Sequence, residues 1–410
     1  MATSQSVRYL NEIRALNALF RNGGMSRADL ARALGLNRST TGKIIANLKD
    51  DALVIERPHR LRGADAPRTG RPGIHIELDP AGACFLGAEI GVDRLTLVAI
   101  DMAARELSRA SLPFPTFAHD APAVADRIAA MVATMLTELG AADRAAGLCI
   151  ALPALLDADG RVINALMIGW RDIRFGELLA ERLAAHLPAL NLPIQIENDA
   201  NAFAIAETYR ATVHRSETVA FLLIENGAGG GIVAGGRLFR GAAGLAGEFG
   251  QIVIGGEGFL AGRHRPGHLE SYIGKDALMA RFSANGANAG ADLGDFLVAL
   301  DAGDSIARRT ASDWGRRLAT GLVQVTSVLN PGAIILGGSV APVFHSVAAE
   351  VEALMRCEFL DGFPMPRIEV SPLGLEGPAL GSAFIMHQRL FSIDERAIYA
   401  SEQPITLFRS

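Results

Sequence analysis

The sequence is poor in cysteine and in long apolar runs, and each shortage argues against a class of protein. Its three cysteines, Cys84, Cys149 and Cys357, lie far apart and form no Cys-x-x-Cys pair, which argues against a disulfide framework or a cysteine-based zinc site. No apolar run approaches the roughly 18 residues of a membrane span, and the N-terminus lacks a secretion-signal pattern. We therefore expect a protein of the reducing cytoplasm with no membrane partner.

Size and charge indicate more than one domain. The 410 residues, half of them hydrophobic and 44 of them glycine, are too many for one core and predict an α/β architecture of two or three domains. Residues 1–73 hold 13 Lys and Arg against 6 Asp and Glu, a net charge of +7, so the remainder carries −12. A basic head on an acidic body is typical of a nucleic-acid module joined to a small-molecule module, because DNA phosphates attract local cations.

Helical patterns fill the first fifty residues. Apolar side chains recur on one side from residue 7 to residue 20. Ser26 is a good N-cap for a second helix, which Gly35 ends, and Asn37 caps a third helix that runs to about Leu48. A helix, a glycine turn and another helix form the helix-turn-helix pattern.

The third helix divides its side chains between two faces. Its apolar face can pack inward and consists of Thr41, Ile44, Ile45 and Leu48. Its outward face is short, polar and cationic and consists of Arg38, Ser39, Thr40 and Lys43. Such side chains reach base edges and phosphates from the major groove. The alternative is the solvated face of an ordinary three-helix bundle, but the spacing of the helices favours DNA binding.

A basic extended segment follows these helices. The apolar residues 53–55 and the basic stretch 57–71 predict a wing whose charges face the DNA backbone. Arg71 stands in a Gly-Arg-Pro segment that is narrow enough to enter the minor groove of A/T-rich DNA. The alternative for this segment is a plain interdomain linker. We place the DNA-binding domain and its linker at residues 1–74.

From Ala83 the pattern changes to apolar strand-like runs, glycine-rich turns and intervening helices. Mixed sheets flanked by helices are the expected result. The expected elements are a β-hairpin over 85–91 and 95–101, helices near 123–139 and 176–186, and strands over 146–152 and 194–196.

Three motifs in the body follow one another in a distinctive order. They are Glu-Asn-Asp-Ala-Asn-Ala at 197–202, Ala-Gly-Glu-Phe-Gly at 246–250 and Gly-His-Leu-Glu at 267–270. With a helix-turn-helix before them, they resemble the ROK family, whose name joins repressors, open reading frames and kinases. The resemblance covers nearly the whole chain.

The resemblance implies an α/β fold in which a winged helix-turn-helix precedes a two-lobed actin-like domain of the sugar-kinase, ribonuclease H-like type. Lobe 1 would span residues 75–205 and be completed by about 378–392. Lobe 2 would span residues 206–377.

The resemblance also implies a set of sugar-binding residues, namely Asn198, Asp199, Glu248, Gln251 and Glu270. Convergent carboxylates and amides suit this role because a pyranose offers several hydroxyls for hydrogen bonds. Asp199 stands where kinase members place their general base. Gln251 replaces a histidine of the family, which leaves the preferred sugar open.

Both phosphate loops of the kinase members are altered in this chain. Where kinases read Asp-x-Gly-Gly-Thr, this chain has Val92, which blocks close approach, and Asp93, which repels phosphate. Where they read Gly-Thr-Gly-Ile-Gly, the stretch 225–231 keeps glycines but begins with Glu225. We expect a former kinase with no catalytic residues, in which Asp199 is a vestige, and with no cofactor.

The zinc motif of the family is also broken. Gln251 stands at its histidine position, and Ala261, Arg263 and His268 stand at its cysteine positions. One imidazole without thiolates does not make a tetrahedral zinc site, so we expect no metal.

These features predict a sugar-responsive transcription regulator, a repressor of carbohydrate metabolism genes. Its partners would be operator DNA and a small sugar, and it would assemble as a homodimer or homotetramer so that paired heads read two half-sites. Two alternatives stay open. One is an active ATP-dependent sugar kinase with an appended DNA-binding domain, and the other is a DNA-binding protein with a vestigial body.

Overall fold

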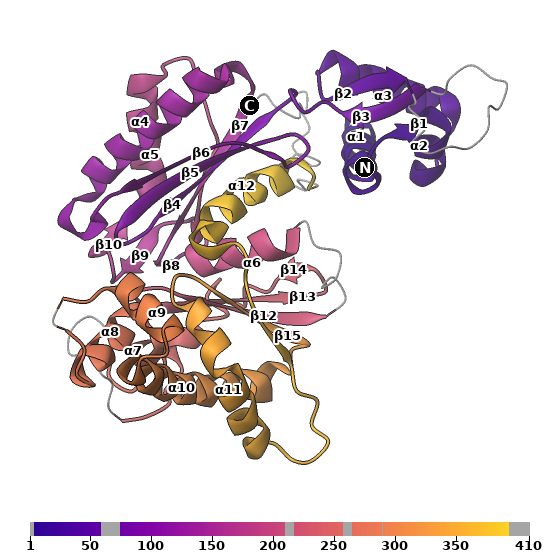
Figure 1. Ribbon diagram of the computed structural model, residues 1–410. Helices are drawn as coiled ribbons and strands as arrows, with labels where there is room; N and C mark the ends of the chain where they lie inside the picture. Colours follow the sequence, from indigo (N-terminus) through magenta and orange to yellow (C-terminus); the bar gives the residue numbers. More distant parts are fainter. Residues whose placement is uncertain (1–3, 59–73, 210–216, 257–264, 289, 393–410) are drawn as a thin grey trace.

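Short helices and a small antiparallel sheet form the N-terminal head. The computed structural model describes residues 4–58, 74–209, 217–256, 265–288 and 290–392 (Figure 1). The sheet has the strand order β1-β3-β2. The elements of the head are α1 (Ser4–Asn22), β1 (Met25–Ser26), α2 (Arg27–Leu34), α3 (Arg38–Asp50), β2 (Val54–Pro58) and β3 (Ile74–Leu78).

Local capping signals set the ends of α2 and α3. The side chain of Ser26 accepts the N–H of Asp29 at 3.1 Å, and the side chain of Asn37 accepts the N–H of Thr40 at 2.8 Å. Gly35 ends α2 in the left-handed conformation with φ 67°. The predicted helix-turn-helix is therefore confirmed.

The small sheet of the head includes a strand, β3, that begins at residue 74. β3 pairs antiparallel with β2, and its residues Ile76 and Leu78 are buried among residues of the head. The basic stretch of sequence between β2 and β3 gave no sign of this second strand.

The sheet of lobe 1 separates two groups of helices. Its strand order is β11-β7-β4-β5-β6, with β4 parallel to β7 and antiparallel to β5. α4 and α5 pack on one face of this sheet. The elements are β4 (Cys84–Ile90), β5 (Arg94–Asp101), β6 (Glu106–Pro113), α4 (Ala121–Leu139), β7 (Ala145–Leu152), β8 (Leu155–Leu156), β9 (Val162–Ala165), β10 (Trp170–Ile173), α5 (Phe175–His186) and β11 (Ile194–Asn198).

Lobe 2 repeats the sheet topology of lobe 1. Its strand order β14-β13-β12-β15-β16 again joins an antiparallel hairpin to parallel strands. The strands are β12 (Thr218–Ile224), β13 (Ala228–Ala234), β14 (Arg237–Leu238), β15 (Ala333–Gly337) and β16 (Arg367–Val370). The helices are α7 (Glu270–Ile273), α8 (Lys275–Ala284), α9 (Leu293–Asp301), α10 (Ser305–Leu329) and α11 (Phe344–Glu358). Short 3₁₀ turns occur in both lobes. Those of lobe 1 are η1 (Thr116–Ala118) and η2 (Ala142–Arg144), and those of lobe 2 are η3 (Phe249–Gln251), η4 (Ala341–Val343) and η5 (Gly374–Glu376).

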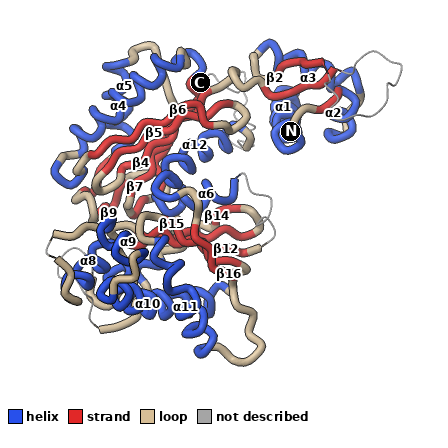
Figure 2. Tube along the Cα trace, viewed as in Figure 1, coloured by secondary structure: helices blue, strands red, loops and turns tan. Residues whose placement is uncertain are grey.

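Two helices, α6 (Asp199–Tyr209) and α12 (Gly377–Leu390), lie between the two sheets (Figure 2). They cross in direct backbone contact, because a Cβ added at Gly381 would lie 1.8 Å from the carbonyl oxygen of Ala202. Glycine at this position lets the helices approach this closely. The crossing places the first residue of α6, Asp199, where the lobes meet.

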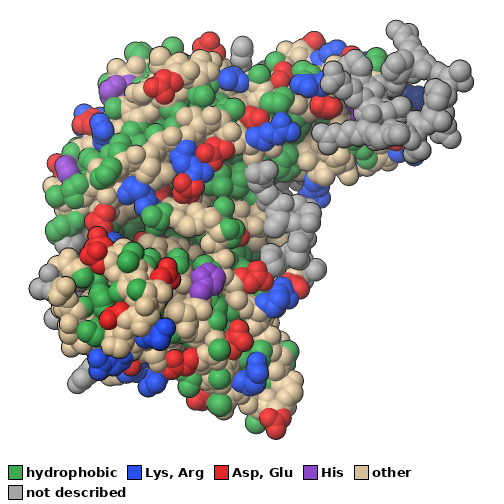
Figure 3. Space-filling view, viewed as in Figure 1, with side chains coloured by type: hydrophobic (Ala, Val, Ile, Leu, Met, Phe, Trp, Pro, Cys, Tyr) green, Lys and Arg blue, Asp and Glu red, His purple; other side chains and the backbone are tan. Residues whose placement is uncertain are grey.

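Charges of both signs are mixed on one face of the body. Figure 3 shows Lys and Arg side chains interspersed with Asp and Glu over both lobes, so the described part of that face carries no extended patch of one sign. A broad phosphate-binding surface on the body would need such a patch. None of the helices in the described ranges is both long and apolar enough to cross a membrane.

Candidate functional site

A cavity of about 500 Å³ lies between the two lobes. Lobe 1 contributes the turn between β4 and β5, and lobe 2 contributes the turn between β12 and β13. The structure brings the five residues expected to bind sugar into its lining, namely Asn198, Asp199, Glu248, Gln251 and Glu270. They come from the end of β11, the start of α6, the turn at η3 and the start of α7.

Asn198 and Asp199 occupy the junction of β11 and α6. The Asn198 side chain donates to the carbonyl of Ala154 at 3.2 Å and accepts the N–H of Asn201 at 3.1 Å, so it caps α6 as well as lining the cavity. Burial raises the pKa of Asp199 to about 6, partly offset by the N–H of Ala200, and the Glu225 carboxylate also raises it. Ionisation of Asp199 in the cavity therefore requires more free energy than ionisation of an exposed aspartate.

Glu248 lies close to other carboxyl groups of the cavity. Burial, together with the neighbouring Asp199 and Glu270 carboxylates, raises the pKa of Glu248 to about 7. Like charges in a partly desolvated cleft favour a ligand that offers hydrogen-bond donors.

The side chain of Gln251 makes hydrogen bonds with the side chains of Glu270 and His268. Its Nε2 donates to Oε1 of Glu270 at 3.1 Å, and its Oε1 accepts from Nδ1 of His268 at 3.0 Å. The amide therefore orients the Glu270 carboxylate.

Of the other expected zinc-motif positions, Ala261 and Arg263 lie outside the described residues. The residues that are described contain no cluster of three or more His, Cys, Asp or Glu suited to a metal.

The turns that resemble phosphate loops are held by carboxylates of the protein. Glu225 accepts two hydrogen bonds from Ser339, one from the backbone N–H and one from Oγ, each at 2.7 Å. Lys275 Nζ lies 3.0 Å from Oδ2 of Asp93 and forms an ion pair between the lobes. These donors are thus already satisfied within the chain.

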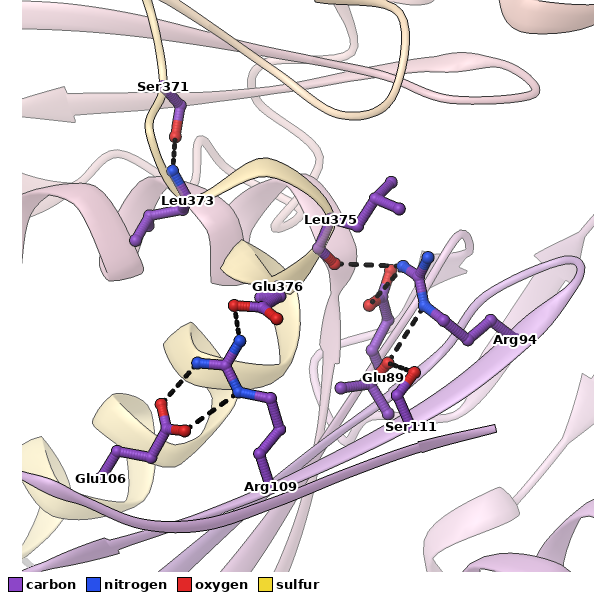
Figure 4. A network of polar contacts seen from close by, with 10 residues as sticks. Glu89, Arg94, Glu106, Arg109, Ser111, Ser371, Leu373, Leu375 and Glu376 are labelled. Atoms are coloured by element: carbon purple, nitrogen blue, oxygen red, sulfur yellow. Dashed lines mark hydrogen bonds and ion pairs between the residues drawn. The ribbon is translucent and has the colours of Figure 1, made fainter. Parts of the chain in front are cut away.

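Arg94 connects the cavity wall to α12 (Figure 4). Its Nη2 donates to the carbonyl of Leu375 at 3.1 Å and lies 3.5 Å from Oε2 of Glu89. Burial raises the pKa of Glu89 to about 8, and the Arg94 charge partly offsets this. In Figure 4, Arg109 joins Glu106 to Glu376 beside it, so two arginines of the lobe 1 sheet hold the segment that leads into α12.

The outward face of α3 is free of the core. Thr41, Ile44, Ile45 and Leu48 are buried as expected. Arg38, Ser39 and Lys43 are exposed and Thr40 is half-buried. Arg71, the residue expected in the minor groove, lies outside the described residues.

Three cations of the cavity were not anticipated from the sequence. Arg94, Arg265 and Lys275 line it beside the carboxylates. Lys275 follows Gly274, where a Cβ would come within 2.4 Å of the carbonyl oxygen of Asn226. Glycine-lysine pairs are common in sequences. Nothing in the sequence near Gly274 therefore indicates its close approach to Asn226.

Comparison with known families assigns both parts of the chain. The ROK family model matches residues 85–389, and a MarR family model matches residues 10–63. The chain belongs to the ROK family. The MarR match covers most of the head, in agreement with its winged helix-turn-helix fold.

Relatives with regulatory functions match this ROK protein along almost its whole length. The xylose repressor of Bacillus subtilis is 24% identical over 395 residues, which cover 94% of this chain and 97% of the repressor. The crystal structure of a ROK family transcriptional regulator, a homolog of the E. coli MLC protein, matches with a TM-score of 0.75 and 22% identity over 94% of this chain and 97% of that chain.

A kinase of the family matches the body. The structure of a ROK family glucokinase from Streptomyces griseus in complex with glucose and AMPPNP matches with a TM-score of 0.64 and 25% identity. The match covers 75% of this chain and 100% of the kinase. The head is therefore what this ROK protein shares with the regulators in addition to the kinase-like body.

Proposed function

We propose that this ROK protein is a sugar-responsive, DNA-binding transcription regulator, and that it acts as a repressor. The observation that carries the proposal is an interlobe cavity lined by all five expected sugar-binding residues, in a chain with an N-terminal winged helix-turn-helix. The nearly full-length match to a xylose repressor supports the repressor role. As a gene regulator, it would act in the cytoplasm, where its operator DNA is.

The chemistry of the cavity suits a small sugar. Burial raises the pKa values of both Asp199 and Glu248, so each carboxylate gains when a hydroxyl donates a hydrogen bond to it. Hydrogen bonds to charged groups contribute about 1.5–3 kcal/mol each. The volume of about 500 Å³ suits a monosaccharide or a modestly substituted derivative.

The head would place α3 in the major groove. The exposed side chains of Arg38, Ser39 and Lys43, with Thr40 beside them, offer donors to base edges and cations to phosphates. Arg71 would add a minor-groove contact from the wing side. Paired heads of a homodimer or homotetramer would read two half-sites.

The body would bind sugar without phosphorylating it. A nucleotide phosphate near the turn after β15 would meet the carboxylate of Glu225, which already holds both donors of Ser339. Asp93 would add a second negative charge, paired with Lys275 across the lobes. Phosphoryl transfer needs the reverse arrangement, in which cations and free N–H groups surround the phosphates. We therefore assign no cofactor, and we keep the expectation that no zinc is bound.

We further propose a division of the chain that follows the observed sheets. The head would end at Leu78 instead of residue 74, lobe 1 would continue to about residue 205 and include α12, and lobe 2 would occupy the residues between. Each lobe then contains one complete five-stranded sheet.

The test is fluorescence anisotropy of the protein on DNA from upstream of its own gene, at one stated salt concentration. D-xylose, D-glucose and N-acetyl-D-galactosamine would be added in turn, within a wider panel of pentoses and hexoses. We expect one sugar to change DNA affinity by about fivefold or more. Asp199→Ala should abolish the response and retain DNA binding. A panel that neither changes DNA affinity nor raises the melting temperature would contradict the proposal.

Kinase activity is tested separately. The wild-type protein and Asp199→Ala would be incubated with ATP, Mg²⁺ and each sugar, and ADP release would be measured. We expect equal, background rates. Sugar-dependent turnover in the wild type well above that of Asp199→Ala would establish a kinase with an appended head.

A further inference from the structure

The head rests on the C-terminal ends of α6 and α12. Phe20 of α1 packs against Tyr209, the last residue of α6, with ring centroids 5.7 Å apart. The same ring lies 5.0 Å from His387 of α12 and 5.2 Å from Phe391, which follows α12. We call Phe20, Tyr209, His387 and Phe391 the head joint. Its hydrophobic cluster is continuous with the core of the head and with the inner face of the lobe 1 sheet.

Hydrogen bonds fix the geometry of the head joint. Nε2 of His387 lies 3.0 Å from the carbonyl of Met102, which only accepts, so Nε2 carries the proton. Nδ1 of His387 therefore accepts from the hydroxyl of Tyr209, at 2.6 Å. Burial lowers the pKa of His387 to about 4, which keeps the ring neutral near pH 7. Asn17 of α1 adds a bond from its Nδ2 to the carbonyl of Phe391 at 2.7 Å.

α6 forms the layer between the lobes. On the lobe 2 side, a Cβ added at Gly231 of β13 would lie 2.9 Å from Cβ of Ala204. On the other side, Gly381 of α12 allows the backbone contact with Ala202. α6 therefore packs closely on both faces, so a movement of lobe 2 against lobe 1 must shift α6 either against β13 of lobe 2 or against α12 of lobe 1. Close-packed interfaces of this kind shift between discrete arrangements, and do not deform smoothly.

Both helices are connected to the cavity. Asp199, in the cavity lining, is the first residue of α6. Arg94, also in the lining, donates to the carbonyl of Leu375, just before α12 (Figure 4). A ligand in the cavity thus touches the start of α6 directly and reaches the segment before α12 through Arg94.

We propose that the position of the Phe20 ring depends on how α6 lies against α12. When a sugar closes the lobes and shifts these helices, the Phe20 contact then moves the head. The inference rests on the proposed function, since it assumes that sugar alters DNA binding. Tyr209 and His387 are then positioning residues. They contact neither sugar nor DNA, and they hold the two helix ends around the Phe20 ring. A ligand that favours one lobe arrangement would favour one head position through this contact.

The test measures coupling instead of affinity alone. Full-length wild type, Phe20→Leu, Phe20→Tyr and Tyr209→Phe would be titrated on the upstream DNA with and without D-xylose, D-glucose or N-acetyl-D-galactosamine, using the sugar that acts on the wild type. The control is Phe363→Leu, because Phe363 is a half-buried ring stacked on Phe359 at 4.3 Å, outside the head joint. Calorimetry would give sugar affinity in the absence of DNA.

We expect the wild type and Phe363→Leu to show the same sugar-dependent change in DNA affinity, about fivefold or more. Phe20→Leu should reduce this factor to below about twofold, while sugar affinity without DNA and DNA affinity without sugar each stay within about threefold. Phe20→Tyr, which keeps the ring, should retain the factor, and Tyr209→Phe should lower it even if Phe20→Leu folds poorly.

The two possible failures are distinguishable. A wild-type protein whose DNA affinity no sugar alters would overturn the proposed function and the head joint with it. A wild-type response that persists unchanged in both Phe20→Leu and Tyr209→Phe would overturn the head joint alone. An equal loss of coupling in Phe363→Leu would show a general effect of destabilisation and would also overturn it.

Discussion

The ionisation of Glu248 lowers the free energy of unfolding of the protein. Burial, with the Asp199 and Glu270 carboxylates nearby, raises the pKa of Glu248 to about 7 from the model-compound value of 4.5. Between these two values the folded chain binds more protons than the unfolded chain. Stability contributed by the protonated group is therefore complete below pH 4.5 and is lost as the pH rises through 7. Binding sites commonly lower stability in this way.

Replacement of the carboxyl by an amide should remove this cost. We expect Glu248→Gln to raise the free energy of unfolding at pH 8 by about 2 kcal/mol, allowing for partial solvent exposure, and to leave it unchanged at pH 4.5. Sugar affinity should fall because an acceptor is lost. Urea unfolding at both pH values measures the first effect. A variant no more stable than the wild type at pH 8 would show that the Glu248 charge is well solvated.

At the scale of single elements, local signals were sufficient for some helices and insufficient for others. Ser26, Asn37 and Gly35 marked the ends of α2 and α3 because capping involves neighbours three or four residues apart. β3 and the head joint depend on residues distant in the chain. Phe20 and His387 lie at opposite ends of the chain, so the sequence offered no local pattern for this contact.

The placement of the site was predictable for a similar reason. Asn198 ends β11 and Asp199 begins α6, and the family motif indicated both residues. The ion pair between Asp93 and Lys275 joins different lobes, so nothing local indicated it. Val92 and Asp93 suggested that phosphate would be excluded, but the hydrogen bonds that Ser339 donates to Glu225 could be found only in three dimensions.

The exposed face of α3 provides a prediction about DNA binding. Arg38 is exposed in the first turn of α3, whereas Lys49, near the end of the same helix, lies 3.2 Å from Glu56. We expect Arg38→Ala to weaken operator binding about 10- to 100-fold, since a direct base contact contributes about 1–3 kcal/mol. Lys49→Ala should change affinity less than about threefold. Anisotropy at fixed salt measures both, and equal losses would place Arg38 outside the groove.

The crossing of α6 and α12 yields a prediction about stability. In Gly381→Ala the new Cβ would meet the carbonyl oxygen of Ala202 at 1.8 Å, so backbone must move. We expect the free energy of unfolding to fall by about 3 kcal/mol. The matched control is Gly42→Ala in α3, where no heavy atom lies within 4 Å, and this change should stabilise by about 0.5–1 kcal/mol. Chemical denaturation compares them, and a neutral Gly381→Ala would mean that the helices can separate at little cost.

Across the whole molecule, interlobe contacts border the cavity. Arg240 of lobe 2 pairs with the buried Glu197 of lobe 1 at 2.5 Å, and Lys275 of lobe 2 pairs with Asp93 of lobe 1 at 3.0 Å. Glu197 immediately precedes Asn198, which lines the cavity, and Asp93 also lies in the cavity lining. Because both pairs depend on how the lobes face each other, a bound sugar that shifts the lobes changes them together, and the head follows through α6 and α12.

If the body sets the distance between two heads, DNA binding must depend on half-site spacing. We expect about 5 base pairs inserted between the half-sites to lower affinity to that of a single half-site, because the second half-site then faces the opposite side of the duplex. An insertion of roughly 10 base pairs, one helical turn, should restore part of the affinity, limited by the reach of the assembled bodies. Anisotropy on matched duplexes measures this, with equal insertions outside the half-sites as controls. Affinity that is indifferent to the insertion of about 5 base pairs would mean that each head binds alone, and that sugar would have to act on the head itself and not on head spacing.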